Sequence, residues 1–331
     1  MAQEEIATRA PESDAQEDST VTTEQSTQST PPIATPATVP SMGDHCTSDR
    51  PTPSGALPSG ELTTLNNVPV YIAKPADYPH SPSKLLLLLT GGTGLHSPNN
   101  QLQADQFASQ GYLVVMPDQF DGDPAPNAVD MTKIEETTSW LESVKLRTAE
   151  GVKAFMIDMW LARHTPEKVL PLLRKVVEGG REEFADAVAN GGGIYGVGYC
   201  FGAKYILVLA GEQADADAAQ APRDEEEGPV KREPVLRAGA IAHPTMVSVE
   251  DLEAVRAPVF IAAVQDDPLF PDEEVLTPGR RAMEKNGVEH EIQVFSGVPH
   301  GFAVLGDYDD PKIKQSQQEA YAQMLAWIRE H

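Results

Sequence analysis

Gly198-Tyr199-Cys200-Phe201-Gly202 is the stretch of this sequence that most constrains its fold. The small, apolar segment Gly193–Val197 precedes it, and the apolar segment Phe201–Ala210 follows it. The first is typical of a buried strand, and the second is typical of a helix with an apolar face. Glycines on both sides of the central residue allow a strand to turn sharply into a helix. This strand–turn–helix pattern is that of a nucleophile elbow.

The central residue of this turn is Cys200. The N–H groups at the start of a helix favour an anion, so a thiol placed there ionises more readily. Cys200 is therefore a candidate nucleophile. The alternative is that Cys200 is only a small buried residue. An acid and a histidine after later strands would favour the nucleophile, because that is the chain order of α/β hydrolases.

Composition separates a tail from a folded domain. The first 44 residues are rich in Thr, Ser, Gln, Pro, Ala and Glu and have few large apolar side chains. Such a segment cannot bury enough apolar surface to offset the entropy of ordering it. We predict a disordered acidic tail over residues 1–44 and one catalytic domain over residues 45–331. An acidic, alanine-rich surface insert is expected at about residues 212–235.

The charge and the motifs exclude several classes of partner. The net charge of −25 argues against binding to nucleic acid or to an anionic membrane. The sequence begins without the pattern of a secretory or mitochondrial signal, and its longest apolar run, Leu85–Leu89, is too short to span a membrane. Two cysteines, Cys46 and Cys200, make no disulfide scaffold. We expect a cytoplasmic protein with a small-molecule partner; the sequence does not specify an oligomeric state.

Apolar strand-like segments alternate with helix-like segments along the predicted domain. The expected strands are Val68–Ile72, Lys84–Leu89, Tyr112–Met116, Gly193–Val197, Ala238–Ala242, Val259–Val264 and Glu291–Phe295. The expected helices are Asn99–Gln110, Val152–Ala162, Phe201–Ala210, Asp272–Asn286 and Pro311–Arg329. This alternation predicts an α/β protein with a mostly parallel, doubly wound sheet and helices on both faces. Pro69 indicates an edge strand, and Pro166 and Pro171 are expected to break the helical pattern.

Catalytic groups in open α/β sheets lie just past the carboxyl ends of the strands. Of the eight histidines, only His243 and His300 directly follow an expected strand, and we expect the other six at the surface. His300 lies in a glycine-rich loop between the last strand and the last helix, where the base of an α/β hydrolase arrives. We expect His243, which Pro244 follows, to support its own loop.

The acid is expected after the strand that precedes the histidine's strand. Asp266 and Asp267 both follow the segment Val259–Val264, and either carboxylate could orient an imidazole. The alternative for the pair is an ordinary turn. Because the chain order is cysteine, aspartate, histidine, the three placements together favour a catalytic triad.

The sequence from about Cys46 to the C-terminus resembles the dienelactone hydrolase family, in particular its fungal-type members. The motifs that carry the likeness are the G-Y-C-F-G elbow, ADQFASQGYLVVMPDQFDGDP (104–124), DPLFP (267–271) and PHGF (299–302). The resemblance implies an α/β-hydrolase fold in which Cys200 is the nucleophile, His300 the base and Asp267 the orienting acid. It also implies hydrolysis of an ester or enol-lactone through a thioester, without metal or cofactor.

The resemblance also implies where the oxyanion would bind and where this chain departs from its family. The expected donors are the N–H groups of Phe201 and of Gly92, in the loop Thr90–Gly94. Well-known members carry an acidic residue that helps to ionise the thiol at the position of Gly91. Three alternatives follow: His300 alone activates Cys200, the substrate differs, or activity is weak.

Three other functions compete with this interpretation. A class I glutamine amidotransferase also uses G-x-C-x-G, but its histidine is followed by an H-x-E pair, whereas Gly301 and Phe302 follow His300. A metal site built from His243, His300 and the two aspartates lacks any recognised ligand spacing. A non-catalytic protein could keep the hydrolase fold and bind a partner through the acidic tail or insert.

Overall fold

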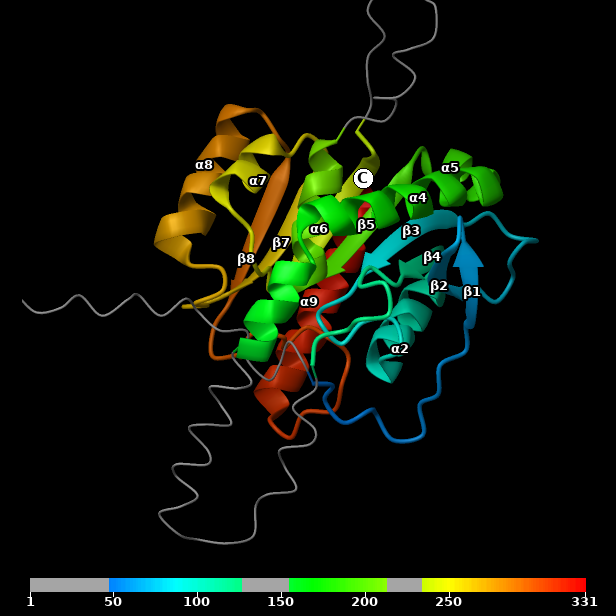
Figure 1. The fold of residues 1–331 in the computed structure, drawn as a ribbon, viewed down its shortest axis with the longest axis horizontal. Helices are drawn as coiled ribbons and strands as arrows, with labels where there is room; N and C mark the ends of the chain where they lie inside the picture. The colour runs from blue at the N-terminus through cyan, green and yellow to red at the C-terminus, as the bar shows by residue number, and fades with distance from the viewer. Residues whose placement is uncertain (1–47, 127–154, 213–233) are drawn as a thin grey trace, which may run out of the picture. The chain divides into compact units, whose positions relative to one another are not determined.

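The computed structural model describes residues 48–126, 155–212 and 234–331 (Figure 1). The predicted tail over residues 1–44 lies outside the described residues, as does most of the predicted insert at 212–235. The centre is an eight-stranded sheet with the order β1-β2-β4-β3-β5-β6-β7-β8. Strand β2 is antiparallel to both of its neighbours, and all pairs from β4 to β8 are parallel. In the part of the chain described here, the helices are too short or too polar to cross a membrane.

Each of the seven expected strands is present in the structure, and β1 is an additional strand. The strands are β1 (Glu61–Leu65), β2 (Val68–Ala73), β3 (Lys84–Leu89), β4 (Tyr112–Pro117), β5 (Ile194–Tyr199), β6 (Leu236–Ala242), β7 (Val259–Val264) and β8 (His290–Phe295). The helices are α2 (Pro98–Ala108), α4 (Pro166–Glu183), α5 (Ala185–Gly191), α6 (Phe201–Gly211), α7 (Val249–Ala254), α8 (Thr277–Lys285) and α9 (Pro311–Glu330). Residues 155–163 are also helical, and a π-helical turn, η4 (Asp272–Leu276), leads into α8.

Helices cover both faces of the sheet, as the sequence predicts. In β3, Leu85, Leu87 and Leu89 belong to one buried cluster and Leu86 and Leu88 to the other, since successive strand residues point to opposite faces. Helices α4 to α8 pack on the first face, and α2 and α9 pack on the second (Figure 1). The unbroken leucine run is therefore explained by burial on both sides. This arrangement confirms the α/β-hydrolase architecture.

The prediction that the Val68–Ile72 segment forms an edge strand is wrong. Strand β2 lies between β1 and β4, and β1 is the edge. The carbonyl of Pro69 accepts the N–H of Asp118, so its nitrogen also faces the β4 side, just outside the first ladder pair, Val70 with Pro117. The missing donor of Pro69 therefore falls at the end of the β2–β4 pairing, beyond that ladder pair, where proline is tolerated. Strand β1 escaped prediction because four of its five residues are exposed and carry no apolar pattern.

The prediction that both prolines break the helical pattern is also wrong for Pro171. Pro166 is the first residue of α4, where its missing N–H costs nothing. Helix α4 continues through Pro171, which removes one backbone bond near the helix start. The helix buries Val169, Leu173 and Val176 against the sheet, and this packing outweighs the lost hydrogen bond.

Candidate active site

Close packing around the elbow explains both of its glycines. Cys200 joins β5 to α6 with φ 51° and ψ −114°, a backbone conformation that residues other than glycine rarely adopt. A Cβ on Gly202 would lie 2.5 Å from the backbone carbonyl of Leu89, and one on Gly198 would lie 2.8 Å from the Cα of Ala203. Only glycine fits at these two positions. The local sequence thus lets α6 start directly against β3 and holds Cys200 in a strained turn.

The loop after β3 runs past the same cysteine. The N–H of Gly202 donates to the carbonyl of Thr90 at 2.9 Å. A Cβ on Gly91 would lie 3.3 Å from the Cβ of Cys200 and 3.9 Å from its sulfur. Gly92 is buried beside this contact, and Phe201 is the first residue of α6, whose N–H has no acceptor within the helix. The two expected oxyanion donors therefore belong to segments that meet at Cys200.

The structure brings His300 and Asp267 together. His300 Nδ1 donates to Asp267 Oδ2 at 2.6 Å, across the loops that follow β8 and β7. The other oxygen, Oδ1, accepts the N–H of Leu269 at 3.0 Å, and the carboxylate is buried. Asp266 is exposed, with a φ of 57°. Of the two candidate acids, only Asp267 contacts the histidine.

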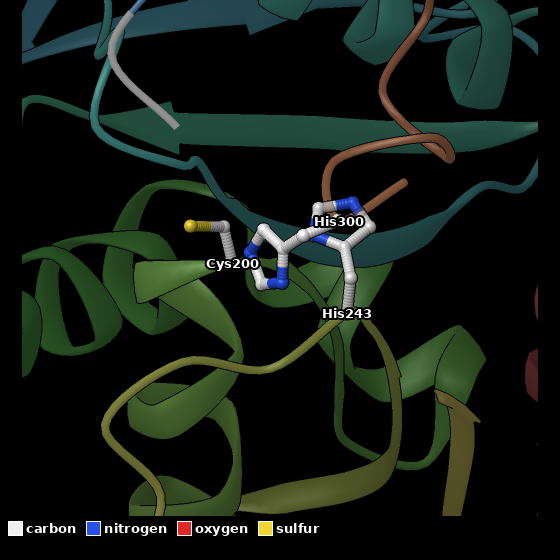
Figure 2. A group of neighbouring side chains, drawn as sticks. All are labelled: Cys200, His243 and His300. Atoms are coloured by element: carbon white, nitrogen blue, oxygen red, sulfur yellow. The ribbon is translucent and has the colours of Figure 1, made fainter. Parts of the chain in front are cut away.

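Cys200, His300 and His243 form a compact group at the carboxyl ends of β5, β6 and β8 (Figure 2). The sulfur and one ring nitrogen of each histidine lie within 4.8 Å of one another. Burial lowers the pKa of His300, but the interactions with Asp267 and Cys200 outweigh it and raise that pKa to about 9. An imidazolium beside a thiol favours the thiolate.

His243 is a site residue that sequence reasoning missed. We expected it to support its loop, yet its side chain is fully buried with its ring centre 4.9 Å from that of His300. Burial lowers the pKa of His243, against an opposing interaction with Cys200. The signal was present, because His243 follows β6 directly and β6 neighbours β5 in the sheet. The two aspartates considered with these histidines as metal ligands do not join the group in that way, because Asp266 is exposed and Asp267 accepts the hydrogen bond of His300 Nδ1.

His164, which we expected at the surface, is instead buried in an aromatic cluster that packs against the residue following Cys200. His164 is buried, and its Nδ1 lies 2.8 Å from the carbonyl oxygen of Trp160. The rings of Trp160, Phe120 and Phe201 pack together with centroid separations of 5.0 to 5.3 Å. The prediction failed because His164 ends a helix whose tertiary packing no local pattern reveals. The cluster fixes Phe201, the residue directly after Cys200.

An open depression of about 290 Å³ adjoins the group on the side of His300. Loops after β7 and β8 line it, with Leu269 and Val298 among its apolar residues and Asp266 at its exposed side. His300 and Asp267 are among its lining residues, whereas Cys200 and His243 are not.

Comparisons with known proteins agree with this architecture. Residues 68–331 match the dienelactone hydrolase family. Hydrolase pyvD of Aspergillus violaceofuscus is 30% identical over 273 residues, covering 82% of this chain and 90% of its own length. Dienlactone hydrolase 1 of Gibberella moniliformis is 26% identical over 275 residues, covering 82% and 87%. A solved Klebsiella pneumoniae structure shares the fold with a TM-score of 0.58 and 16% identity, covering 82% of this chain and 99% of its own. The chain belongs to the dienelactone hydrolase family, a family of ester and lactone hydrolases.

Proposed function

We propose that this protein is a carboxylic-ester hydrolase that cleaves an ester or enol-lactone through Cys200, His300 and Asp267. The observation that carries the proposal is the buried 2.6 Å bond between His300 Nδ1 and Asp267 Oδ2, which leaves His300 Nε2 for Cys200. That bond fixes the ring tautomer and favours the imidazolium. The assignment of Asp267 and His300 to these roles thus rests on their geometry as well as on chain order.

Acylation begins from the thiolate of Cys200 and the imidazolium of His300. The sulfur attacks the substrate carbonyl carbon, a carbon–sulfur bond forms, and the π electrons move to the oxygen. The N–H groups of Phe201 and Gly92 are the proposed donors to this oxyanion. When the intermediate collapses, the carbon–oxygen bond breaks and the leaving oxygen takes the proton from His300 Nε2. The products of this step are a thioester on Cys200 and a neutral imidazole.

Deacylation uses the same groups in reverse. A water molecule gives a proton to His300 Nε2 while its oxygen bonds to the thioester carbon. Collapse of the second tetrahedral intermediate breaks the carbon–sulfur bond and releases the carboxylic acid, which ionises in water. The thiolate and the imidazolium are restored, and Asp267 holds the imidazole in one orientation throughout. The steps balance without a redox partner or cofactor.

The test is acyl transfer to Cys200 itself. We expect p-nitrophenyl acetate to acetylate Cys200, detectable by mass spectrometry of the intact protein, and the Cys200→Ala variant to lose at least about 10³-fold in turnover. Cys46→Ala is the matched control, because Cys46 is the other cysteine of the chain and keeps the elbow intact. A panel of lactones and short-chain esters then defines the substrate class.

Two results would reject the proposal. One is a Cys200→Ala variant that hydrolyses the ester at the wild-type rate. The other is a Cys200 thiol that reacts with iodoacetamide at neutral pH no faster than a cysteine in a short peptide. That second result would instead support the non-catalytic, partner-binding protein that the sequence left as an alternative.

A further inference from the structure

His243 is a buried polar side chain that the fold itself does not use. It has no exposed surface, and among the residues described neither ring nitrogen has a polar partner other than the interaction with Cys200. A buried imidazole that makes no hydrogen bond to the rest of the fold destabilises it, and such groups are rare in native interiors. The sulfur of Cys200, one ring nitrogen of His300 and one ring nitrogen of His243 lie within 4.8 Å of one another (Figure 2). The ring is therefore placed for chemistry at Cys200.

The loop that carries His243 is anchored to the elbow. The N–H of Thr245 donates to the carbonyl of Cys200 at 3.2 Å. Lys204, one helical turn after Cys200, donates through Nζ to the carbonyl of Met246 at 2.8 Å and to Asp251 at 2.7 Å. His243 itself has a φ of 37°, a strained value for a side-chain-bearing residue. These contacts offset the strain and hold the imidazole at a fixed place beside the sulfur.

We propose that His243 is a further catalytic residue, whose ring N–H donates to the sulfur of Cys200 and holds it as a thiolate beside His300. This inference rests on the proposed function, because it assigns a second histidine to the same nucleophile. His243 keeps its proton throughout the cycle. It supports the attacking thiolate in acylation, and it supports the same sulfur as the leaving group when the thioester breaks down.

The surrounding groups give the two histidines different charges. His300 is held as an imidazolium by Asp267, so a second cation nearby would be repelled. Burial and the neighbouring His300 favour the neutral form of His243, which has one N–H donor and one bare nitrogen. Asp267 favours the charged form of His243, and Tyr199 of β5 also lies near the ring, with its own ring centre 6.0 Å away. Gly91, from the loop after β3, adds no ionisable side chain.

The test compares two substitutions in the full-length protein. His243→Gln keeps a neutral N–H donor, whereas His243→Leu keeps most of the volume and removes the donor. We measure the thiolate of Cys200 by its ultraviolet absorbance and by the iodoacetamide rate from pH 5 to 10. Loss of the donor is expected to raise the thiol pKa by about one unit and to slow alkylation below that pKa about tenfold. The glutamine variant is expected to stay within about threefold of wild type, because its amide keeps the donor.

The wild-type protein provides a measurement that does not depend on a variant's folding. In a spectrum of ¹⁵N-labelled histidine at neutral pH, His243 is expected to be neutral, and its N–H signal is expected to shift when Cys200 is alkylated. A leucine variant that titrates like wild type overturns the inference, as does a His243 signal that alkylation leaves unmoved. Neither result bears on the proposed function, which fails only if Cys200 takes up no acyl group or proves dispensable.

Discussion

Two loops of this protein each present a histidine to Cys200, and they hold it in different ways. In the loop after β8, the imidazole of His300 is itself fixed, because Asp267 accepts its Nδ1–H at 2.6 Å. In the loop after β6, the imidazole of His243 makes no such bond, and the backbone is fixed instead through Lys204 and Met246. The first arrangement favours a charged ring and the second a neutral one. A single sulfur can thus receive both a proton carrier and a fixed hydrogen-bond donor.

The largest expected effect comes from removing the charge that holds His300. Asp267→Asn keeps the size of the side chain but removes the carboxylate and permits the wrong tautomer. We expect kcat/KM for an activated ester to fall by about 10²- to 10⁴-fold. Measured at neutral pH, this loss of activity reports the contribution of the loop after β8 alone, because the loop after β6 is unchanged in the variant.

Asp266→Asn is the matched control for that experiment. Asp266 is exposed and has a φ of 57°. Asparagine adopts this left-handed backbone conformation as readily as aspartate does, so the substitution adds no backbone strain. Its activity is expected to stay within about twofold of wild type, because the side chain does not contact His300. If the Asp266 variant lost activity and the Asp267 variant kept it, our assignment of the acid would be wrong.

The second expected effect concerns the free energy of unfolding, which we expect His300 to lower as the pH rises and His243 to lower as the pH falls. The pKa of His300 is raised to about 9, so the native state holds its proton more tightly than the unfolded state. Its contribution is complete below about pH 6.5 and is lost as the pH rises through 9, on the order of 3 kcal/mol in all. The pKa of His243 is lowered, so its contribution is complete above about pH 6.5 and is lost toward acid.

Urea unfolding of three proteins across the pH range measures this opposition. Relative to wild type, His300→Gln is expected to flatten the fall in unfolding free energy between about pH 6.5 and 9. His243→Gln is expected to flatten the fall below about pH 6.5 and to leave the alkaline limb unchanged. Two variants with the same pH profile would contradict the assignment of opposite charges to the two rings.

The same contrast explains what could be predicted from the sequence. His300 was found because it combines a strand end, flanking glycines and an acid after the preceding strand, all of which are local patterns. Asp267 could be separated from Asp266 only through the family's spacing, and the structure separates them by burial and by the bond to His300. His243 follows a strand end too, but its role depends on which strand neighbours β5. Strand order is a tertiary property that one sequence does not state.

The remaining misses have the same physical origin. The edge strand β1 has no apolar alternation, so only its pairing with β2 reveals it. Pro171 is tolerated within α4 because one face of that helix is buried against the sheet. His164 is buried because an aromatic cluster closes over it. In each case packing between distant segments outweighed a local preference.

The smallest expected effect tests the other half of the comparison, the anchor of the loop after β6. Lys204→Met keeps the length of the side chain while removing the bonds to Met246 and to Asp251, in a pair whose side chains are 17% exposed. We expect a loss of about 1 kcal/mol in unfolding free energy and about a threefold slower alkylation of Cys200 at neutral pH. Lys314→Met, which removes an exposed pair with Asp307, is the control and is expected to change stability by less than about 0.5 kcal/mol. Lys204 makes no hydrogen bond to the reacting atoms, so we expect it to act by positioning His243. In that case Lys204→Met slows the alkylation of Cys200 in the wild-type protein but has no further effect in the His243→Leu variant. Additive losses in the double variant would mean instead that the anchor and the imidazole act on Cys200 independently.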